Sequence, residues 1–171
     1  METLKTPFNT IIVGMTACGK THYLLELFEK ECKEHFDNIY LLCPTLSWNK
    51  THQKWRFIND PDFIAVECSQ DDIDHFLAEI VYVAWGTNSL LILDHCASGR
   101  VIKNRTSELV KLGFSARHHG LSTIVLTQQL NFVSKPFREQ ISKLVSFLSL
   151  AKRGQDLIFE DFLGAVDRDE R

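Results

Sequence analysis

The sequence contains no apolar run that approaches the length of a membrane span, and its first residues, METLKTPFN, do not form a secretory signal. A spanning helix needs about 20 consecutive apolar residues, so these absences disfavour a membrane protein and a secreted one. Internal repeats, low-complexity tracts and linkers are also absent from the 171 residues. We therefore expect one domain over residues 1–171, an intracellular location and no membrane partner.

Paired cysteines are absent as well. The chain has five cysteines, an odd number, and no two of them have the Cys-x-x-Cys spacing. This pattern disfavours both a disulfide framework and a structural zinc site. It is typical of a protein in a reducing compartment.

Acidic residues are scarce in one part of the chain. Residues 100–153 contain two, Glu108 and Glu139, against ten Lys and Arg, a net charge of +8, whereas residues 1–99 have a net charge of −7. The ten basic residues are Arg100, Lys103, Arg105, Lys111, Arg117, Lys135, Arg138, Lys143, Lys152 and Arg153. This basic third favours a polyanionic partner such as DNA, and the alternative is an ordinary solvated surface. Because the whole chain has a net charge of −3, a DNA contact must be local or must arise in an oligomer.

The segment GMTACGKT has the form G-x-x-x-x-G-K-[ST] of a phosphate-binding loop. Its members are Gly14, Met15, Thr16, Ala17, Cys18, Gly19, Lys20 and Thr21. A β-branched run precedes the loop, and apolar residues at helical spacing follow it, which is the required order of strand, loop and helix N-terminus. The loop backbone would bind the phosphates of a nucleotide, Lys20 would reach the β- and γ-phosphates, and Thr21 would offer its hydroxyl to Mg²⁺.

Strand-like and helix-like segments alternate along the rest of the chain. We expect strands over 38–45, 63–68, 89–96, 121–129 and 145–151, and helices over 71–85, 106–119, 135–144 and 156–164. Residues 47–62 are predicted to be a loop or a short helix. Such alternation predicts an α/β fold with a mostly parallel central sheet and helices on both faces.

The run LLIL ends in Asp94, which places this carboxylate at the carboxyl edge of the sheet, where ligands collect. There it can hold Mg²⁺ together with Thr21. His95 follows, at the position where ATPases of this broad class carry an acidic residue that polarises the attacking water. His95 is a candidate base, since an imidazole has an ordinary pKa of about 6.5. The alternatives are that His95 is structural and hydrolysis is slow, or that Glu67 or Asp71 acts instead.

Two further candidates follow. Gln128 ends the predicted strand 121–129, where its amide can touch both the γ-phosphate and water; strand alternation places either Gln128 or Gln129, but not both, on the nucleotide side. Arg117 lies near the end of the preceding helix. It is either an arginine finger that enters the site of a neighbouring subunit, or an ordinary surface cation at a helix C-terminus.

Together these stretches resemble the FtsK–HerA superfamily and, within it, the poxvirus-type viral DNA-packaging ATPases. The resemblance is carried by IIVGMTACGKT, IYLLCPT, LLILDHC and, most specifically, SARHHGLSTIVLTQQL, and it covers roughly residues 8 to 150. In the last block the matching positions are Arg117, Gly120, Ser122, Thr127 and Gln128. KPFREQI resembles the helix that follows in that family.

The resemblance implies a P-loop NTPase core of the RecA-like ASCE class, a three-layer sandwich that hydrolyses ATP with Mg²⁺. It also implies a ring, commonly a hexamer, that translocates double-stranded DNA into a preformed capsid. A capsid or portal-vertex protein would then be a partner, and the location would be the host cell or the virion. The chain departs from the family at His95, and it ends soon after the last predicted strand, so we expect any DNA contact to come from core loops.

Other functions stay open. A nucleotide or nucleoside kinase suits the length and the loop, but it needs an arginine-rich lid or a base pocket. A GTPase is disfavoured, because the guanine-reading Asn-Lys-x-Asp motif is absent. The third alternative is a scaffold that binds ATP, assembles and hardly hydrolyses it, a possibility that His95 supports.

Overall fold

The computed structural model describes residues 7–32, 35–52, 55, 58–69, 72–96, 100–147 and 152–164. Six strands form a single sheet in the order β3-β2-β4-β5-β1-β6, and every pairing is parallel. The strands are β1 (Asn9–Val13), β2 (Asn38–Leu42), β3 (Phe63–Val66), β4 (Ser89–Leu93), β5 (Leu121–Thr127) and β6 (Lys143–Ser146). The helices are α1 (Lys20–Leu27), α2 (Ile73–Val83), α3 (Arg100–Lys103), α4 (Glu108–Ser115), α5 (Lys135–Arg138) and α6 (Lys152–Phe162).

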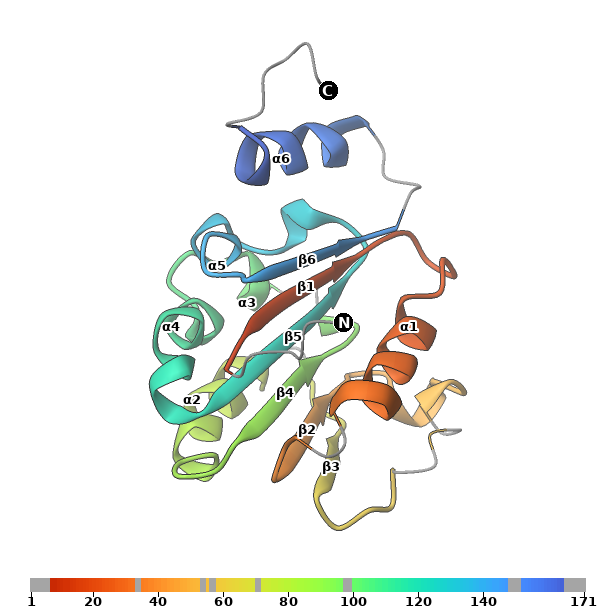
Figure 1. The fold of residues 1–171 in the computed structure, drawn as a ribbon, viewed down its shortest axis with the longest axis vertical. Coiled ribbons are helices and arrows are strands. Elements are labelled where there is room, and N and C mark those ends of the chain that lie inside the picture. The colour runs from red at the N-terminus through yellow and green to blue at the C-terminus, as the bar shows by residue number, and fades with distance from the viewer. Residues whose placement is uncertain are drawn as a thin grey trace.

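Side-chain alternation along the central strands divides the core into two clusters, one on each face of the sheet. Ile11 and Leu91 belong to the cluster that contains buried residues of α2 and α4, whereas Ile12 and Leu90 belong to the cluster under α1. Successive residues of a strand point to opposite faces, so strands buried on both faces appear as the continuous apolar runs of this sequence. Figure 1 shows α1 on one side of the sheet and α2, α4 and α5 on the other. The expected three-layer α/β architecture is confirmed.

The strand register brings three chain segments to one edge of the sheet. Val13 of β1 pairs with Thr127 of β5, and Leu93 of β4 pairs with Val125 of β5. Because all three strands are parallel, the residues after each of them emerge at the same carboxyl edge. The phosphate loop after β1, Asp94 after β4 and Gln128 after β5 therefore become neighbours.

The amino edge of the same strands carries a tight turn. After α4 the chain forms a 3₁₀ helix, Ala116–His119, and ends it at Gly120, whose φ is 71°. This is the left-handed conformation that glycine tolerates best. The carbonyl of Gly120 accepts a hydrogen bond of 3.0 Å from the Ser89 N–H, which fixes the start of β5 beside that of β4.

Several expected boundaries are wrong: α6 begins at Lys152 and not at 156, and the boundary between α5 and β6 is misplaced. A helix was expected over 135–144 and a strand over 145–151, but α5 ends at Arg138 and β6 already begins at Lys143. Residues 142–146 instead lie along the edge of β1, where the Asn9 carbonyl accepts hydrogen bonds from both the N–H and the hydroxyl of Ser142. Pairing with β1 thus overrides the local helical pattern. Residues 148–151 of the expected strand lie outside the described residues.

The last helix, α6, lies beyond β6 (Figure 1) and is held to the core by a buried ion pair. Arg138 Nε lies 2.8 Å from Asp161 Oδ2, and its Nη1 donates to the Val133 carbonyl at 2.6 Å. Arg138 is only 7% exposed, so this member of the basic third is not available to a nucleic acid. Among the described residues, no helix combines the length and the apolar character needed to span a membrane.

Candidate nucleotide-binding site

The loop between β1 and α1 has the geometry that phosphate binding requires. Gly19 has a φ of 99° immediately before α1 begins at Lys20. A Cβ at Gly14 would lie 2.7 Å from the sulfur of Cys18 and 2.8 Å from the Cβ of Phe147, so no side chain fits there. The two glycines therefore allow the close backbone turn that presents N–H groups, at the positive end of the α1 dipole, to an anion.

Lys20 lies over this loop. Its ammonium group donates hydrogen bonds to the Gly14 carbonyl at 2.7 Å and to the Met15 carbonyl at 2.8 Å. These two bonds hold the positive charge of Lys20 at the loop. A phosphate in the loop would lie within reach of this ammonium group, as expected for the lysine of a GKT sequence.

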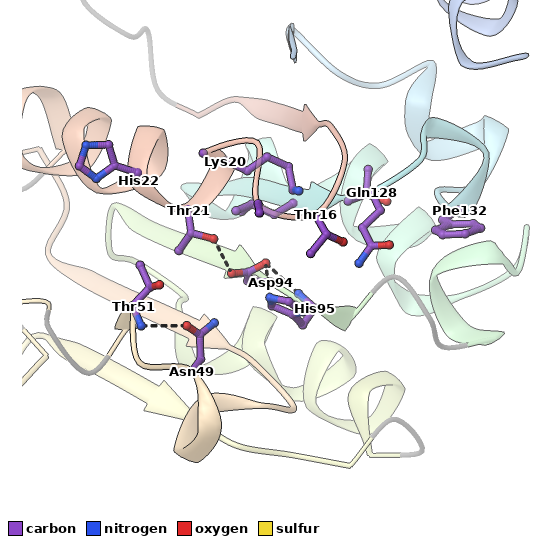
Figure 2. Close-up of a pocket in the computed structure, with 14 residues that line it drawn as sticks. Thr16, Lys20, Thr21, His22, Asn49, Thr51, Asp94, His95, Gln128 and Phe132 are labelled. Carbon is purple, nitrogen blue, oxygen red and sulfur yellow. Dashed lines mark hydrogen bonds and ion pairs between the residues drawn. The ribbon is translucent and has the colours of Figure 1, made fainter. Parts of the chain in front are cut away.

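Asp94 is buried, with 3% exposure, and its carboxylate faces Thr21 at the start of α1 (Figure 2). The Thr21 hydroxyl donates to Asp94 Oδ2 at 3.4 Å, and the His95 N–H donates to Oδ1 at 2.9 Å. A hydroxyl and a carboxylate this close are hard oxygen donors of the kind Mg²⁺ prefers. No group of three or more His, Cys, Asp or Glu suited to a metal occurs among the described residues. The site therefore fits an ion that takes its other ligands from phosphates and water.

A third group contacts the Asp94 carboxylate, and the sequence did not predict it. His52 is fully buried, and its Nε2 lies 3.2 Å from Asp94 Oδ2. Burial alone would lower the pKa of His52, but the contacts with Asp94 and with Cys43 outweigh burial and raise it to about 9. The imidazole is therefore protonated at neutral pH. His52 and Asp94 thus form a buried ion pair.

These groups surround a pocket of about 380 Å³ at the carboxyl edge of the sheet. Its lining comes from four segments: Thr16, Ala17, Gly19, Lys20, Thr21 and His22 around the loop, Asn49 and Thr51 after β2, Asp94 and His95 after β4, and Leu126, Thr127, Gln128 and Phe132 around the end of β5. Both non-glycine residues with positive φ in the described chain, Ala17 at 61° and His95 at 58°, line this pocket. Backbone strain of this kind collects at functional sites, which supports assigning the pocket a ligand.

Comparison with known proteins gives the family of the chain. The family model described as Poxvirus A32 protein matches residues 1–160. The chain belongs to the poxvirus A32 family. The resemblance to poxvirus-type ATPases inferred from the sequence is thereby confirmed. No curated protein matches the chain in sequence.

Solved structures show how widely the fold of this A32-family chain is shared. The genome packaging NTPase B204 from Sulfolobus turreted icosahedral virus 2, in complex with ATPγS, has a TM-score of 0.69 at 16% identity, over 93% of this chain and 83% of that one. B204, the DNA-packaging ATPase from Sulfolobus turreted icosahedral virus, gives 0.70 at 18% identity, over 91% and 83%. The N-terminal domain of zonular occludens toxin from Neisseria meningitidis gives 0.54 at 15%, over 84% and 78%. At these identities the likeness is one of fold.

Most of the predicted site residues of the A32-family chain lie together. Lys20, Thr21, Asp94, His95 and Gln128 all line the pocket. Met15 lines an adjoining cavity of about 350 Å³, which shares Thr16 and Gln128 with the nucleotide pocket. Gln129 lines that second cavity only, as expected if one of the two glutamines faces the nucleotide. Gly14 and Cys18 shape the loop from behind.

Arg117 is the exception. It lies in the 3₁₀ helix just before β5, at the opposite edge of the sheet from the pocket. The seven residues of β5 separate these edges, which at about 3.3 Å per residue is roughly 20 Å. Arg117 therefore does not take part in the nucleotide site of its own chain.

Of the two alternative carboxylates, the structure places Glu67 away from the pocket. Glu67 does not line the pocket; its two carboxylate oxygens accept hydrogen bonds from the N–H and the hydroxyl of Ser47, at 3.0 and 2.8 Å. Glu67 thus anchors the short 3₁₀ helix Leu46–Trp48. Asp71, the other candidate, lies outside the described residues.

Sequence reasoning missed the segment 49–52, which contributes Asn49 and Thr51 to the pocket and His52 to Asp94. It also missed Phe132, from the 3₁₀ helix after β5. The one available signal was position, since the residues after a parallel strand gather at the ligand-binding edge. The polar segment after β2 carries no motif that distinguishes it from an ordinary loop.

Proposed function

We propose that this A32-family chain is an ATPase that translocates double-stranded DNA, with packaging of a viral genome as its task. The observation that carries the proposal is the meeting of the GKT loop, Asp94 and Gln128 in one pocket. Membership of the poxvirus A32 family and the fold shared with genome packaging NTPases support the choice of DNA as the substrate.

Five side chains of the pocket, together with the loop backbone, have a role in this proposal. The loop backbone and Lys20 bind the β- and γ-phosphates and neutralise their charge. Thr21 and Asp94 hold Mg²⁺, which polarises the phosphate oxygens and balances the charge that develops there. Gln128 orients the water that attacks the γ-phosphorus, and His95 accepts a proton from it. His95 is suitably placed, because its side chain is 43% exposed and its Nε2 lies 3.9 Å from Asp94 Oδ1.

The position of Arg117 supports assembly into a ring, and we propose that the ring is a hexamer. Since Arg117 lies at the edge away from its own pocket, it can act only at the nucleotide of a neighbouring subunit. Its surroundings suit a protein contact: Trp85 and Phe114 are exposed by 66% and 51%. Phe114 lies one turn before Arg117, and the Trp85 ring lies 4.8 Å from that of His119. Exposed apolar patches commonly mark interaction sites.

DNA is assigned to the basic third, without Arg117 and the buried Arg138. Lys103 illustrates a suitable cation: its ammonium lies 4.4 Å from the ring centroid of Phe132, which lines the nucleotide pocket. A backbone contact through such residues is electrostatic and independent of sequence. A capsid or portal-vertex protein completes the proposed partners, with the host cell or the virion as the location.

Kinase activity is less well supported. A nucleotide or nucleoside kinase needs arginines that hold the acceptor, and Lys20 is the sole Lys or Arg among the described residues that line the pocket. A scaffold with little hydrolysis is the remaining alternative, which His95 favours. It predicts ATP binding and assembly without phosphate release.

The trans role of Arg117 can be tested by mixing two inactive variants. Lys20→Ala is expected to lose ATP binding and turnover, whereas Arg117→Ala is expected to bind ATP normally and to lose turnover in the assembly. Mixed assemblies would contain interfaces in which an intact Lys20 faces an intact Arg117. We therefore expect mixing to restore ATP hydrolysis.

Two results would contradict this assignment. In one, the mixture stays inactive although both variants co-assemble in size-exclusion chromatography. In the other, Arg117→Ala reduces turnover equally in dilute, monomeric protein. Either result would return Arg117 to the role of a surface cation.

A further inference from the structure

His52 is a buried histidine that the proposed mechanism does not use. It lies in the segment that follows β2 and crosses the sheet edge beside the nucleotide pocket, where its neighbours Asn49 and Thr51 line the cavity. A titratable side chain with no solvent exposure is uncommon unless it has a partner. Its partner here is Asp94, at 3.2 Å.

The packing around His52 restricts the movement of its ring. Trp55, itself 2% exposed, meets the imidazole edge-on, with ring centroids 4.6 Å apart and planes at 88°. The backbone N–H of Trp55 donates to the His52 carbonyl at 3.0 Å, and the Trp55 ring packs in turn on Phe63 of β3. Two aromatic side chains from different elements thus form a wall behind the imidazole.

The contacts of Asp94 show what this wall supports. Oδ1 accepts a hydrogen bond from the His95 N–H, while Oδ2 is shared by the Thr21 hydroxyl and the His52 imidazole. Thr21 and His95 are both part of the pocket lining, and His52 is not. The imidazole therefore holds the carboxylate from the protein side.

We propose that His52 is a positioning residue that holds the Asp94 carboxylate toward Thr21 for binding of the metal–nucleotide complex. The inference rests on the proposed function, because it takes Asp94 and Thr21 as the residues that hold Mg²⁺. Groups that orient a metal ligand from behind govern its affinity, and their loss typically weakens metal binding 10–100-fold. His52 acts through Asp94 and does not touch the nucleotide.

The test measures metal binding without turnover. Mn²⁺ replaces Mg²⁺, a non-hydrolysable ATP analogue fills the pocket, and electron paramagnetic resonance gives the Mn²⁺ dissociation constant. Binding of the analogue in EDTA is measured in parallel. We expect His52→Leu to weaken Mn²⁺ binding about 10–100-fold with little change in metal-free nucleotide binding. His52→Gln, which keeps a donor, is expected to lie between His52→Leu and the wild type.

Phe63→Leu is the matched control. It removes packing from the same aromatic wall but does not touch Asp94, so it should lower stability and leave the Mn²⁺ affinity unchanged. If His52→Leu does not fold, His52→Gln decides: a selective loss of Mn²⁺ affinity supports the proposal, and wild-type affinity overturns it.

Three other results would overturn the positioning role. One is an unchanged Mn²⁺ affinity in folded His52→Leu, and the second is an equal loss of metal-free nucleotide binding, which would indicate a general packing defect. The third is a wild-type protein that binds no Mn²⁺–nucleotide complex, which would refute the proposed function as well. A wild type that binds the complex but ignores DNA would refute translocation and leave the role of His52 intact.

Discussion

Replacing Gly120 by alanine should destabilise the protein well beyond the same replacement at Gly86. Both glycines have a left-handed backbone, with φ of 71° and 78°. An added Cβ would lie 2.5 Å from the Thr87 carbonyl oxygen at Gly120 but would meet nothing within 4 Å at Gly86. The obstacle at Gly120 is backbone in the turn before β4, and the Gly120 carbonyl is itself bonded to Ser89, so neither side can move freely.

The two variants separate conformational strain from the clash. Left-handed alanine costs about 1–2 kcal/mol at either site. Overpacking against a fixed group adds about 1–3 kcal/mol at Gly120. At roughly 2–4 °C per kcal/mol for a chain of this size, the melting temperature should fall by about 2–8 °C for Gly86→Ala and by about 4–20 °C for Gly120→Ala.

Thermal and urea unfolding, followed by circular dichroism, measure both effects on the same scale. The wild type and both variants should show the same dependence of the unfolding free energy on urea, so that the midpoints report stability directly. Equal losses of stability in Gly86→Ala and Gly120→Ala would refute the reasoning. They would mean that the turn before β5 shifts at no cost.

Three further predictions follow from individual contacts. His95→Glu should raise turnover, measured by phosphate release, toward the about 10²-fold gain that a well-placed base supplies, if the imidazole is a poor substitute for a carboxylate base. A fall in turnover would show that the imidazole serves better than a carboxylate at this position. Arg138→Met should lower the free energy of unfolding, measured in urea, by about 3–5 kcal/mol, because it leaves the Asp161 charge buried and unpaired. Adding Asp161→Leu should recover much of this loss, and an Arg138→Met variant as stable as the wild type would contradict the prediction. Peptide mapping after alkylation should find Cys18, in the loop, modified in the free protein and protected when ATP is bound. Cys96 should react slowly, because burial raises the pKa of its thiol. Alkylation of Cys18 at the same rate with and without ATP would contradict the placement of the nucleotide.

The sheet and the centre of the site were predictable because their signals are local. Continuous apolar runs identified β1, β4 and β5, and the parallel arrangement then required Asp94 and Gln128 to meet the loop at one edge. The same rule explains why Arg117, which precedes β5, lies at the other edge, although this position was not predicted from the sequence.

The remaining features depend on contacts between distant segments. β6 is four residues long and only partly buried, so it has no apolar run to reveal it, and its position follows from pairing with the edge of β1. His52 is an unremarkable polar residue in the sequence, and only the folded chain brings it to Asp94. In the sequence Arg138 is one more cation of the basic third, and only the folded chain pairs it with Asp161 of α6.

Phosphate release from ATP, with and without double-stranded DNA at low and moderate salt, tests the proposed function most directly. We predict that DNA stimulates turnover and that this stimulation fades as salt screens the contact between the basic third and the phosphate backbone. Clear ATP binding without phosphate release in any of these conditions would contradict it, and would identify the protein as a nucleotide-binding scaffold instead.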